Sequence, residues 1–189
     1  MIKRDPFESG WHLLKPKRQP KTEKPFVKLW LDTVFLQRLQ RYLSPTEDEE
    51  SVILAGISAP RINGRILIPT SPFMPDYRAQ SVGGVEATPE SMLRIDRKLA
   101  ACGLEKIARA HSHPFKGIGA CTPSRTDTGD QEAFEAAGYL IPSMIFTRVQ
   151  FGSFFVRVFM SDRLRLGVQV YGKAVMREKN VYEIPQEHH

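Results

Sequence analysis

KIARAHSHPFKGIGACTPSRTDTGDQEAFEAAG, residues 106–138, joins a predicted strand to a predicted helix through a loop rich in glycine and proline. Residues 106–113 predict the strand. Residues 122–138 predict the helix, with Thr122 as its N-terminal cap and Pro123 in its first position. The fold class follows from the elements predicted on either side of this unit.

Strand patterns occur both before and after this unit. Six segments are β-favouring or continuously apolar: 26–32, 51–57, 65–69, 140–149, 151–160 and 166–172. Asn63-Gly64 predicts a hairpin turn between the second and third of them. Residues 71–87 carry two prolines and a Gly-Gly pair, and predict a long loop.

Two further helices are predicted in the first half of the chain. Residues 33–43 have apolar residues at helical spacing after a cap at Asp32 or Thr33. The other helix runs from a Thr88 cap to about residue 101, where a glycine follows. Mixed strands and helices with adjacent hairpins predict one α+β domain, in which helices flank a mixed central sheet.

Length and composition limit the class of protein. A chain of 189 residues with 41% hydrophobic and 25% charged residues suits one globular domain. The chain contains no run of about 18 apolar residues, so no membrane span is predicted. The N-terminus lacks the apolar segment that a secretory signal would have. The two cysteines, Cys102 and Cys121, are too few for a disulfide framework, so we expect a cytoplasmic location.

The positive charge is concentrated at the N-terminus. Residues 1–28 carry +5 of the net charge of +6, which leaves +1 for the rest of the chain. Proline spacing and charge density predict an extended basic arm over residues 1–25, followed by the domain at 26–185. A solvated arm is the simpler interpretation, and binding of nucleic acid or an acidic partner is the alternative. His188 and His189 resemble the start of an expression tag and are left out of metal arguments.

The quoted stretch carries a pattern of metal ligands. Strand geometry places His111 and His113 on one side, where two imidazoles form half of a tetrahedral zinc site. Ser124 and Asp127 share a face near the start of the next helix, so Asp127 can supply a third ligand. Two histidines, one carboxylate and an open fourth position describe a catalytic zinc site, because a structural site is normally closed by four protein ligands.

These residues resemble the signature of the JAMM zinc metalloproteases, also called the MPN+ or JAB family. The signature is an upstream Glu, then His-x-His-Pro, then Ser-x-x-Asp. HSHP at 111–114 and SRTD at 124–127 match it, and the match extends to Pro123. The order of predicted elements over roughly residues 26–160 is similar as well. The resemblance implies a JAB/MPN-type fold with a bound zinc ion (Zn2+), held by the two histidines and the aspartate.

The resemblance also implies the catalytic residues and the substrate. Counting back seven residues from Gly56 reaches Glu49 as the general base, with Glu50 as the alternative one register away. Ser124 would donate a hydrogen bond to the oxyanion. The implied reaction hydrolyses the amide bond after the C-terminal glycine of a ubiquitin-like protein, in deconjugation or precursor processing. The small stand-alone domain resembles bacterial members, whose operons encode E1- or E2-like enzymes. We expect neither a membrane nor a nucleic-acid partner.

The loop between the two motifs is longer than in the family. Ten residues rather than seven separate the second histidine from the serine, and Gly117 and Gly119 make such an insertion easy to accommodate. Asp130 is a fallback ligand, although it lies six residues from Ser124. Cys121 lies in the same loop; we predict a small residue in a turn, with approach to the metal as the alternative.

Other functions fit the sequence less well. A zinc deaminase would need His-x-Glu with Pro-Cys-x-x-Cys, and a zincin protease would need HExxH; neither motif occurs. A nucleic-acid-binding protein would depend on the basic arm, which lacks interleaved aromatic residues. The main alternative to an enzyme is a non-catalytic MPN-type scaffold that binds a partner protein. The complete ligand set favours an enzyme, because scaffolds usually lack one or more of these residues.

Overall fold

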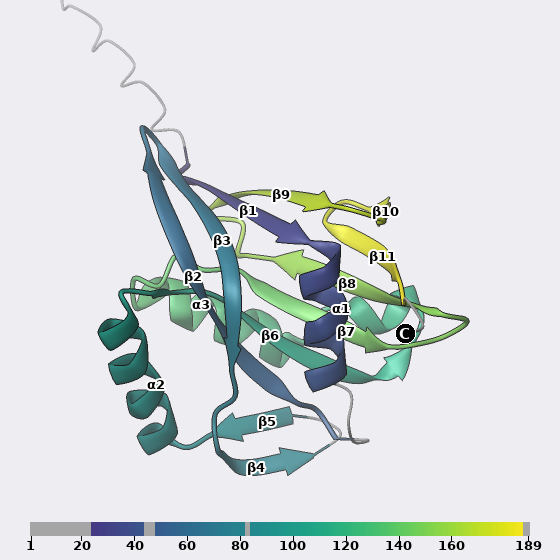
Figure 1. The fold of residues 1–189 in the computed structure, drawn as a ribbon, viewed down its shortest axis with the longest axis horizontal. Helices are drawn as coiled ribbons and strands as arrows, with labels where there is room; N and C mark the ends of the chain where they lie inside the picture. The colour runs from purple at the N-terminus through teal and green to yellow at the C-terminus, as the bar shows by residue number, and fades with distance from the viewer. Residues whose placement is uncertain (1–23, 44–47, 82–83, 187–189) are drawn as a thin grey trace, which may run out of the picture.

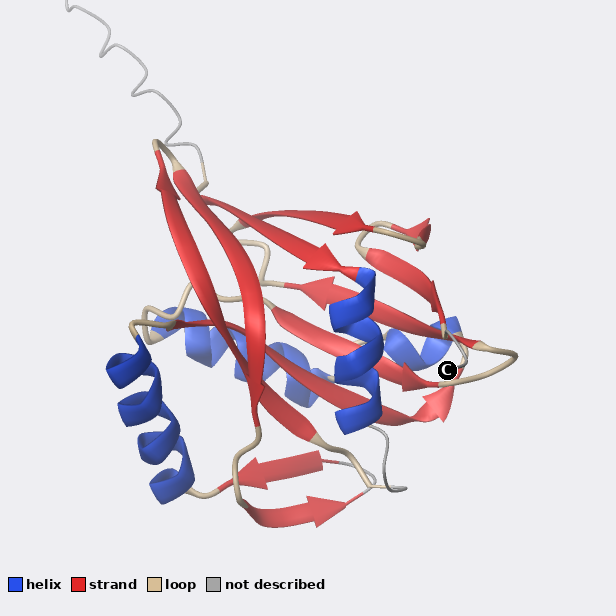
Figure 2. Cartoon of the chain, viewed as in Figure 1, coloured by secondary structure: helices blue, strands red, loops and turns tan. Residues whose placement is uncertain are grey.

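A computed structural model describes residues 24–43, 48–81 and 84–186. The expected α+β class is confirmed: a strongly curled, mixed sheet of nine strands is flanked by three α-helices (Figure 1; Figure 2). Nearly all of the predicted basic arm, together with His188 and His189, lies outside the described residues. No helix in the described ranges is long and apolar enough to cross a membrane.

Strands make up most of the described chain, and the helices lie between groups of strands. The strands are β1 (Phe26–Asp32), β2 (Ser51–Arg61), β3 (Gly64–Phe73), β4 (Tyr77–Ser81), β5 (Gly84–Ala87), β6 (Glu105–Lys116), β7 (Ser143–Arg148), β8 (Ser153–Phe159), β9 (Arg165–Tyr171), β10 (Val175–Glu178) and β11 (Val181–Pro185). The helices are α1 (Thr33–Tyr42), α2 (Pro89–Cys102) and α3 (Arg125–Ala136), with a short 3-10 helix η1 (Ile118–Cys121). The large sheet has the order β10-β11-β8-β7-β6-β2-β3-β1-β9, and β4 and β5 form a separate hairpin.

Helix α1 covers one face of the large sheet. The Asp32 carboxylate caps it by accepting hydrogen bonds from the backbone N–H groups of Val34 and Phe35, as the sequence predicts. Its apolar stripe, represented by Leu36 and Leu39, is fully buried in the main core. Burying a leucine side chain contributes roughly 1.5–3 kcal/mol, so this stripe fixes the helix on the sheet.

Strand β6 lies near the middle of the sheet, between antiparallel β2 and parallel β7. On the face toward α1, Val52 pairs with Ala110, and both are buried in the main core. The alternate residues therefore face the other way, toward the side that carries α2 and α3. There Ile53, next to β6, packs with Ile95 of α2 in a second apolar cluster. This second face is the one that receives the histidines.

The structure corrects the prediction of a long loop over residues 71–87. Strand β3 continues to Phe73, and residues 77–81 and 84–87 form the paired strands β4 and β5. The prolines misled the prediction because β1 pairs with β3 only as far as Leu67. Beyond that point β3 has β2 alone as a partner, so Pro72 lies where one side of the strand needs no ladder hydrogen bonds. Pro75 lies between β3 and β4.

The helix after the histidines also begins later than predicted. Its cap is Ser124, not Thr122, and its first residue is Arg125. Ser124 outcompetes Thr122 because it forms a capping box with Asp127, which satisfies two backbone donors at once. The strand before it is longer than predicted and runs on to Lys116.

The end of the chain contains two strands that the sequence patterns missed. Strands β10 and β11 follow the predicted closing strands and extend the sheet beyond β8. The two-residue turn between them includes Asn180 at a φ of 59°, a conformation that asparagine tolerates. Strand β9, although it follows β8 in the chain, instead pairs with β1 in parallel at the far edge.

Candidate metal centre

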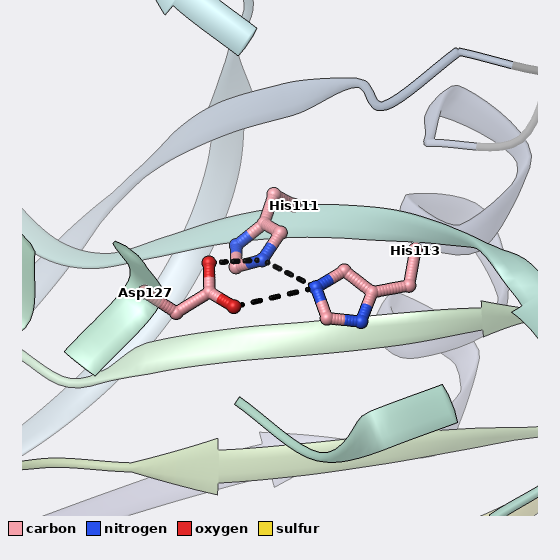
Figure 3. Close-up of side chains that lie close together, drawn as sticks. All are labelled: His111, His113 and Asp127. Carbon is pink, nitrogen blue, oxygen red and sulfur yellow. Dashed lines mark hydrogen bonds and ion pairs between the residues drawn. The ribbon is translucent and has the colours of Figure 1, made fainter. Parts of the chain in front are cut away.

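His111, His113 and Asp127 converge at one point on the second face of the sheet. The two imidazoles project from β6 toward the carboxylate on the first turn of α3 (Figure 3). The Nε2 atoms of His111 and His113 lie 3.2 Å apart. Asp127 places Oδ1 3.0 Å from His111 Nε2 and Oδ2 3.5 Å from His113 Nε2. All three ligand atoms fall within 4.8 Å of one another, so the group could hold a metal ion.

The spacing of these atoms suits a small tetrahedral ion. Zinc binds nitrogen and oxygen at about 2.0–2.2 Å, so two ligands of one tetrahedral ion lie roughly 3.3 Å apart. His111 Nε2 lies 3.2 Å from His113 Nε2 and 3.0 Å from Asp127 Oδ1, close to that value, while the 3.5 Å contact of His113 is to the other carboxylate oxygen. The group could therefore hold one shared metal ion.

The capping box of α3 positions Asp127. The backbone N–H of Ser124 donates to Asp127 Oδ2 over 2.7 Å, and the backbone N–H of Asp127 donates to Ser124 Oγ over 3.1 Å. These two bonds fix the carboxylate at the helix N-terminus, where the helix dipole favours negative charge. The ten residues between His113 and Ser124 thus bring Asp127 back to the histidines.

The insertion also orients one of the histidines. Residues 118–121 form η1, and the carbonyl oxygen of Ala120 lies 2.6 Å from His113 Nδ1. A hydrogen bond from Nδ1 to this carbonyl would orient the ring so that Nε2 faces the other ligands. Cys121, the last residue of η1, is fully buried, and burial raises the pKa of its thiol to about 12. It lies outside the group of ligand atoms, so the interpretation as a small turn residue describes it better than approach to the metal.

The pKa values of Asp127 and His113 depend on the contacts between them. Burial alone would raise the pKa of Asp127, but hydrogen bonds from His111 and His113 outweigh it and hold that pKa far below its usual range. For His113, burial lowers the pKa, while the bonds to Asp127 and Ala120 raise it above its usual value overall. A metal ion must therefore displace protons from the imidazoles, which makes binding weaker at low pH.

Of the two glutamates, the one that lines the cavity at the metal centre is Glu49. Its backbone N–H donates to the Ser81 carbonyl over 3.0 Å, and its carbonyl accepts from the Gln80 side chain over 3.1 Å. Burial raises the pKa of Glu49, and the nearby imidazoles partly oppose that shift. Glu50 is instead buried and does not line the cavity. Its backbone exchanges hydrogen bonds with Ser112, on the side of β6 opposite the histidines.

Ser124 lines the same cavity as the metal ligands and Glu49. Its hydroxyl oxygen accepts from the Asp127 backbone, and the hydroxyl hydrogen can still be donated to a bound molecule. The fallback ligand, Asp130, is not part of the ligand group among the described residues. Its carboxylate points instead toward Arg109, with Oδ2 4.0 Å from Nη1.

The cavity has a volume of about 710 Å³ and extends well beyond the metal centre. Its walls include the β4–β5 hairpin on one side and Arg109 and Phe134 on the other. Residues 71–87 were expected from the sequence to form a wall, whereas Arg109 and Phe134 were not. Arg109 could have been found from strand alternation, because it lies two residues before His111 and thus on the same face of β6. The hairpin was hidden by its glycines and the neighbouring prolines.

Comparisons with known proteins leave the family open. No family model matches the chain, and no curated protein matches its sequence. Among solved structures, the chain is similar to the solution structure of protein DSY2949 from Desulfitobacterium hafniense. The two share 13% sequence identity, with a TM-score of 0.48, over 77% of this chain and 95% of that one. Inference about function must therefore come from the geometry of the site.

Proposed function

We propose that this protein is a zinc-dependent amide hydrolase of the JAMM type. The observation that carries the proposal is the convergence of His111, His113 and Asp127 on one cavity that Glu49 and Ser124 also line. Three protein ligands beside an open cavity are the arrangement of a catalytic metal rather than of a structural one. A carboxylate and a hydroxyl next to them supply the base and the hydrogen-bond donor that amide hydrolysis needs.

Each of these residues would have a separate role in the reaction. His111, His113 and Asp127 would hold the ion, and a bound zinc ion supplies the Lewis acidity that lets water attack an amide near neutral pH. Glu49 accepts a proton from the attacking water and passes it to the departing amine nitrogen as the carbon–nitrogen bond breaks. Its raised pKa makes it a better proton acceptor than an ordinary glutamate. Ser124 donates its hydroxyl hydrogen to the carbonyl oxygen while negative charge develops there.

The substrate class that we propose is the C-terminal tail of a ubiquitin-like protein, cleaved after its last glycine. A thin, extended tail can enter a cavity bounded by a β-hairpin, and it can pair its backbone with a strand edge as other extended peptides do. Both deconjugation and precursor processing use this bond. Partners of the E1 or E2 type are part of the same proposal.

The proposal is tested by loading the purified protein with zinc and offering it a fluorogenic peptide that ends in Gly-Gly. We expect about one zinc per chain and hydrolysis that a chelator abolishes and added zinc restores. A non-catalytic scaffold would bind the tail of a ubiquitin-like protein without cleaving it, whether or not zinc is present. A protein that binds no zinc would contradict the proposal at its first step.

Replacement of Ser124 by alanine should slow hydrolysis by roughly 10²–10³-fold, because one donor to the developing oxyanion is lost. The capping bond to the Asp127 backbone is lost as well, which should destabilise the protein by about 1 kcal/mol. Steady-state kinetics and thermal unfolding separate the two effects. Ser124→Gly is the matched control. Glycine is a tolerated helix cap but donates no side-chain hydrogen bond, so this variant should lose activity as Ser124→Ala does while it loses less stability. If both variants keep full activity, Ser124 has no part in the chemistry.

A further inference from the structure

Arg109 is a cation built into the wall of the cavity that holds the metal centre. It lies two residues before His111 on β6, and residues so spaced are about 7 Å apart along a strand. Its side chain is only 19% exposed. An arginine two residues from a candidate ligand, lining the same cavity, is placed to contact whatever that cavity binds.

The side chain is held in position from two sides. Arg109 Nε donates to Ser143 Oγ over 2.6 Å, and the guanidinium carbon lies 4.5 Å from the centre of the Phe134 ring. Ser143 in turn donates to Gln131, which is itself buried and bonded to the Ile141 carbonyl. Such a chain of hydrogen bonds restricts the arginine to one orientation before any ligand arrives. Preorganisation of this kind favours recognition of a specific group.

The charge of Arg109 is incompletely compensated by the described part of the chain. The carboxylate of Asp130 lies 4.0 Å away, beyond hydrogen-bonding distance, and its side chain is 63% exposed. The terminal amino groups of the guanidinium therefore offer the planar pair of donors that binds a carboxylate in bidentate fashion.

We propose that Arg109 is a specificity-determining residue that binds a carboxylate on the leaving-group side of the scissile amide. This inference rests on the proposed hydrolase function and narrows its substrate. The carboxylate has two sources: the free C-terminal α-carboxylate of the released residue, or an acidic side chain on that residue. A leaving group that is a lysine side chain within a protein brings no such α-carboxylate.

The consequence for substrate class is specific. Water adds across the amide, the acyl side leaves as a carboxylic acid, and the released residue leaves as a free amine whose own carboxylate stays paired with Arg109. Removal of a terminal residue from a tail or conjugate would thus be favoured over cleavage of an isopeptide bond. The cavity of about 710 Å³ has room for a released amino acid beside the tail.

The experiment uses three acetylated peptides with the zinc-loaded protein: Gly-Gly-Ala with a free carboxylate, the same peptide as a carboxamide, and Gly-Gly-Glu as a carboxamide. We expect kcat/KM for the free acid to exceed that for its carboxamide by roughly 10- to 100-fold, which corresponds to a charge-assisted hydrogen bond. Arg109→Gln should remove this preference, mainly through KM. If the Gly-Gly-Glu carboxamide is instead the peptide cleaved faster than the Gly-Gly-Ala carboxamide, Arg109 still binds a carboxylate, and that carboxylate belongs to the acidic side chain.

Two further variants test whether the role of Arg109 is purely structural. Arg109→Lys keeps the charge without the planar fork, so it should retain a reduced preference. Asp130→Asn removes the competing carboxylate and should increase the preference by a few fold, while it leaves the hydrogen bond to Ser143 intact. Thermal unfolding establishes that each variant is folded. Equal rates for all three peptides in the unaltered protein, or a preference that persists in Arg109→Gln, would overturn the inference.

A binding measurement separates this inference from the proposed function. Calorimetric titration of the same peptides into zinc-loaded Glu49→Gln reports recognition without cleavage. If no peptide is cleaved by the unaltered protein but the free acid still binds more tightly through Arg109, the inference stands and the hydrolase proposal fails. If the carboxamide is cleaved but binding shows no carboxylate preference, the hydrolase proposal stands and the inference fails.

Discussion

Replacement of Glu49 by glutamine should reduce hydrolysis by about 10²–10⁴-fold, the range that a positioned general base contributes. Glutamine has nearly the same shape but cannot accept the proton of the attacking water. Zinc binding should be unchanged, because Glu49 lines the cavity without belonging to the ligand group. Single-turnover kinetics together with zinc content by atomic absorption would measure both properties on one sample.

Glu50→Gln is the matched control for this variant. Glu50 is buried and does not line the cavity, so its replacement should affect stability more than catalysis. Thermal unfolding and the same kinetic measurement compare the two positions directly. Loss of catalysis in Glu50→Gln with full activity in Glu49→Gln would reverse the assignment of the base.

Replacement of His111 by alanine should abolish both zinc binding and hydrolysis. Only two ligands would remain, and a three-ligand catalytic site does not tolerate the loss of one without a large loss of affinity. The protein itself should stay folded, because His111 is only part-buried and its β6 backbone remains paired with β2 and β7. Zinc titration with a colorimetric chelator and circular dichroism would establish the two outcomes.

Phe115→Ala is the control for a change on the same strand. Phe115 lines the same cavity, is 60% exposed and offers no metal donor. This variant should bind zinc as tightly as the unaltered protein. Full zinc occupancy in His111→Ala would show that the metal lies elsewhere and would remove the basis of the proposed function.

The local elements were largely predictable because their signals are short-range. The Asp32 cap of α1, and the Thr88 cap and Gly103 end of α2, lie where the residue types indicate. Each depends on backbone groups within a few positions, so flanking sequence is sufficient to find it. The start of α3 was misplaced because Thr122 and Ser124 are both good caps. The reciprocal bond with Asp127, three residues further on, decided between them.

Pairing between strands was much less predictable. The β2–β3 hairpin was expected from its turn, but the parallel pairs of β1 with β9 and β6 with β7 join segments far apart in the chain. No local pattern encodes such partners, since a strand exposes the same hydrogen-bonding edge whatever lies beside it. The β4–β5 hairpin and the two last strands were missed for a related reason: each strand has only four or five residues, and those of β4 and β10 are mostly exposed.

The sequence therefore determines which side chains are available as candidate metal ligands, whereas the fold decides whether those side chains meet at one site. Alternation along a strand is enough to put His111 and His113 on one side, and the Ser-x-x-Asp spacing is enough to bring Ser124 and Asp127 together. Only the tertiary structure brings these two pairs to within 3.5 Å, sets Glu49 rather than Glu50 in the cavity, and adds Arg109 to its wall. Those relations depend on how β2 and α3 pack against β6, and packing between distant segments is decided by the whole core rather than by any one stretch.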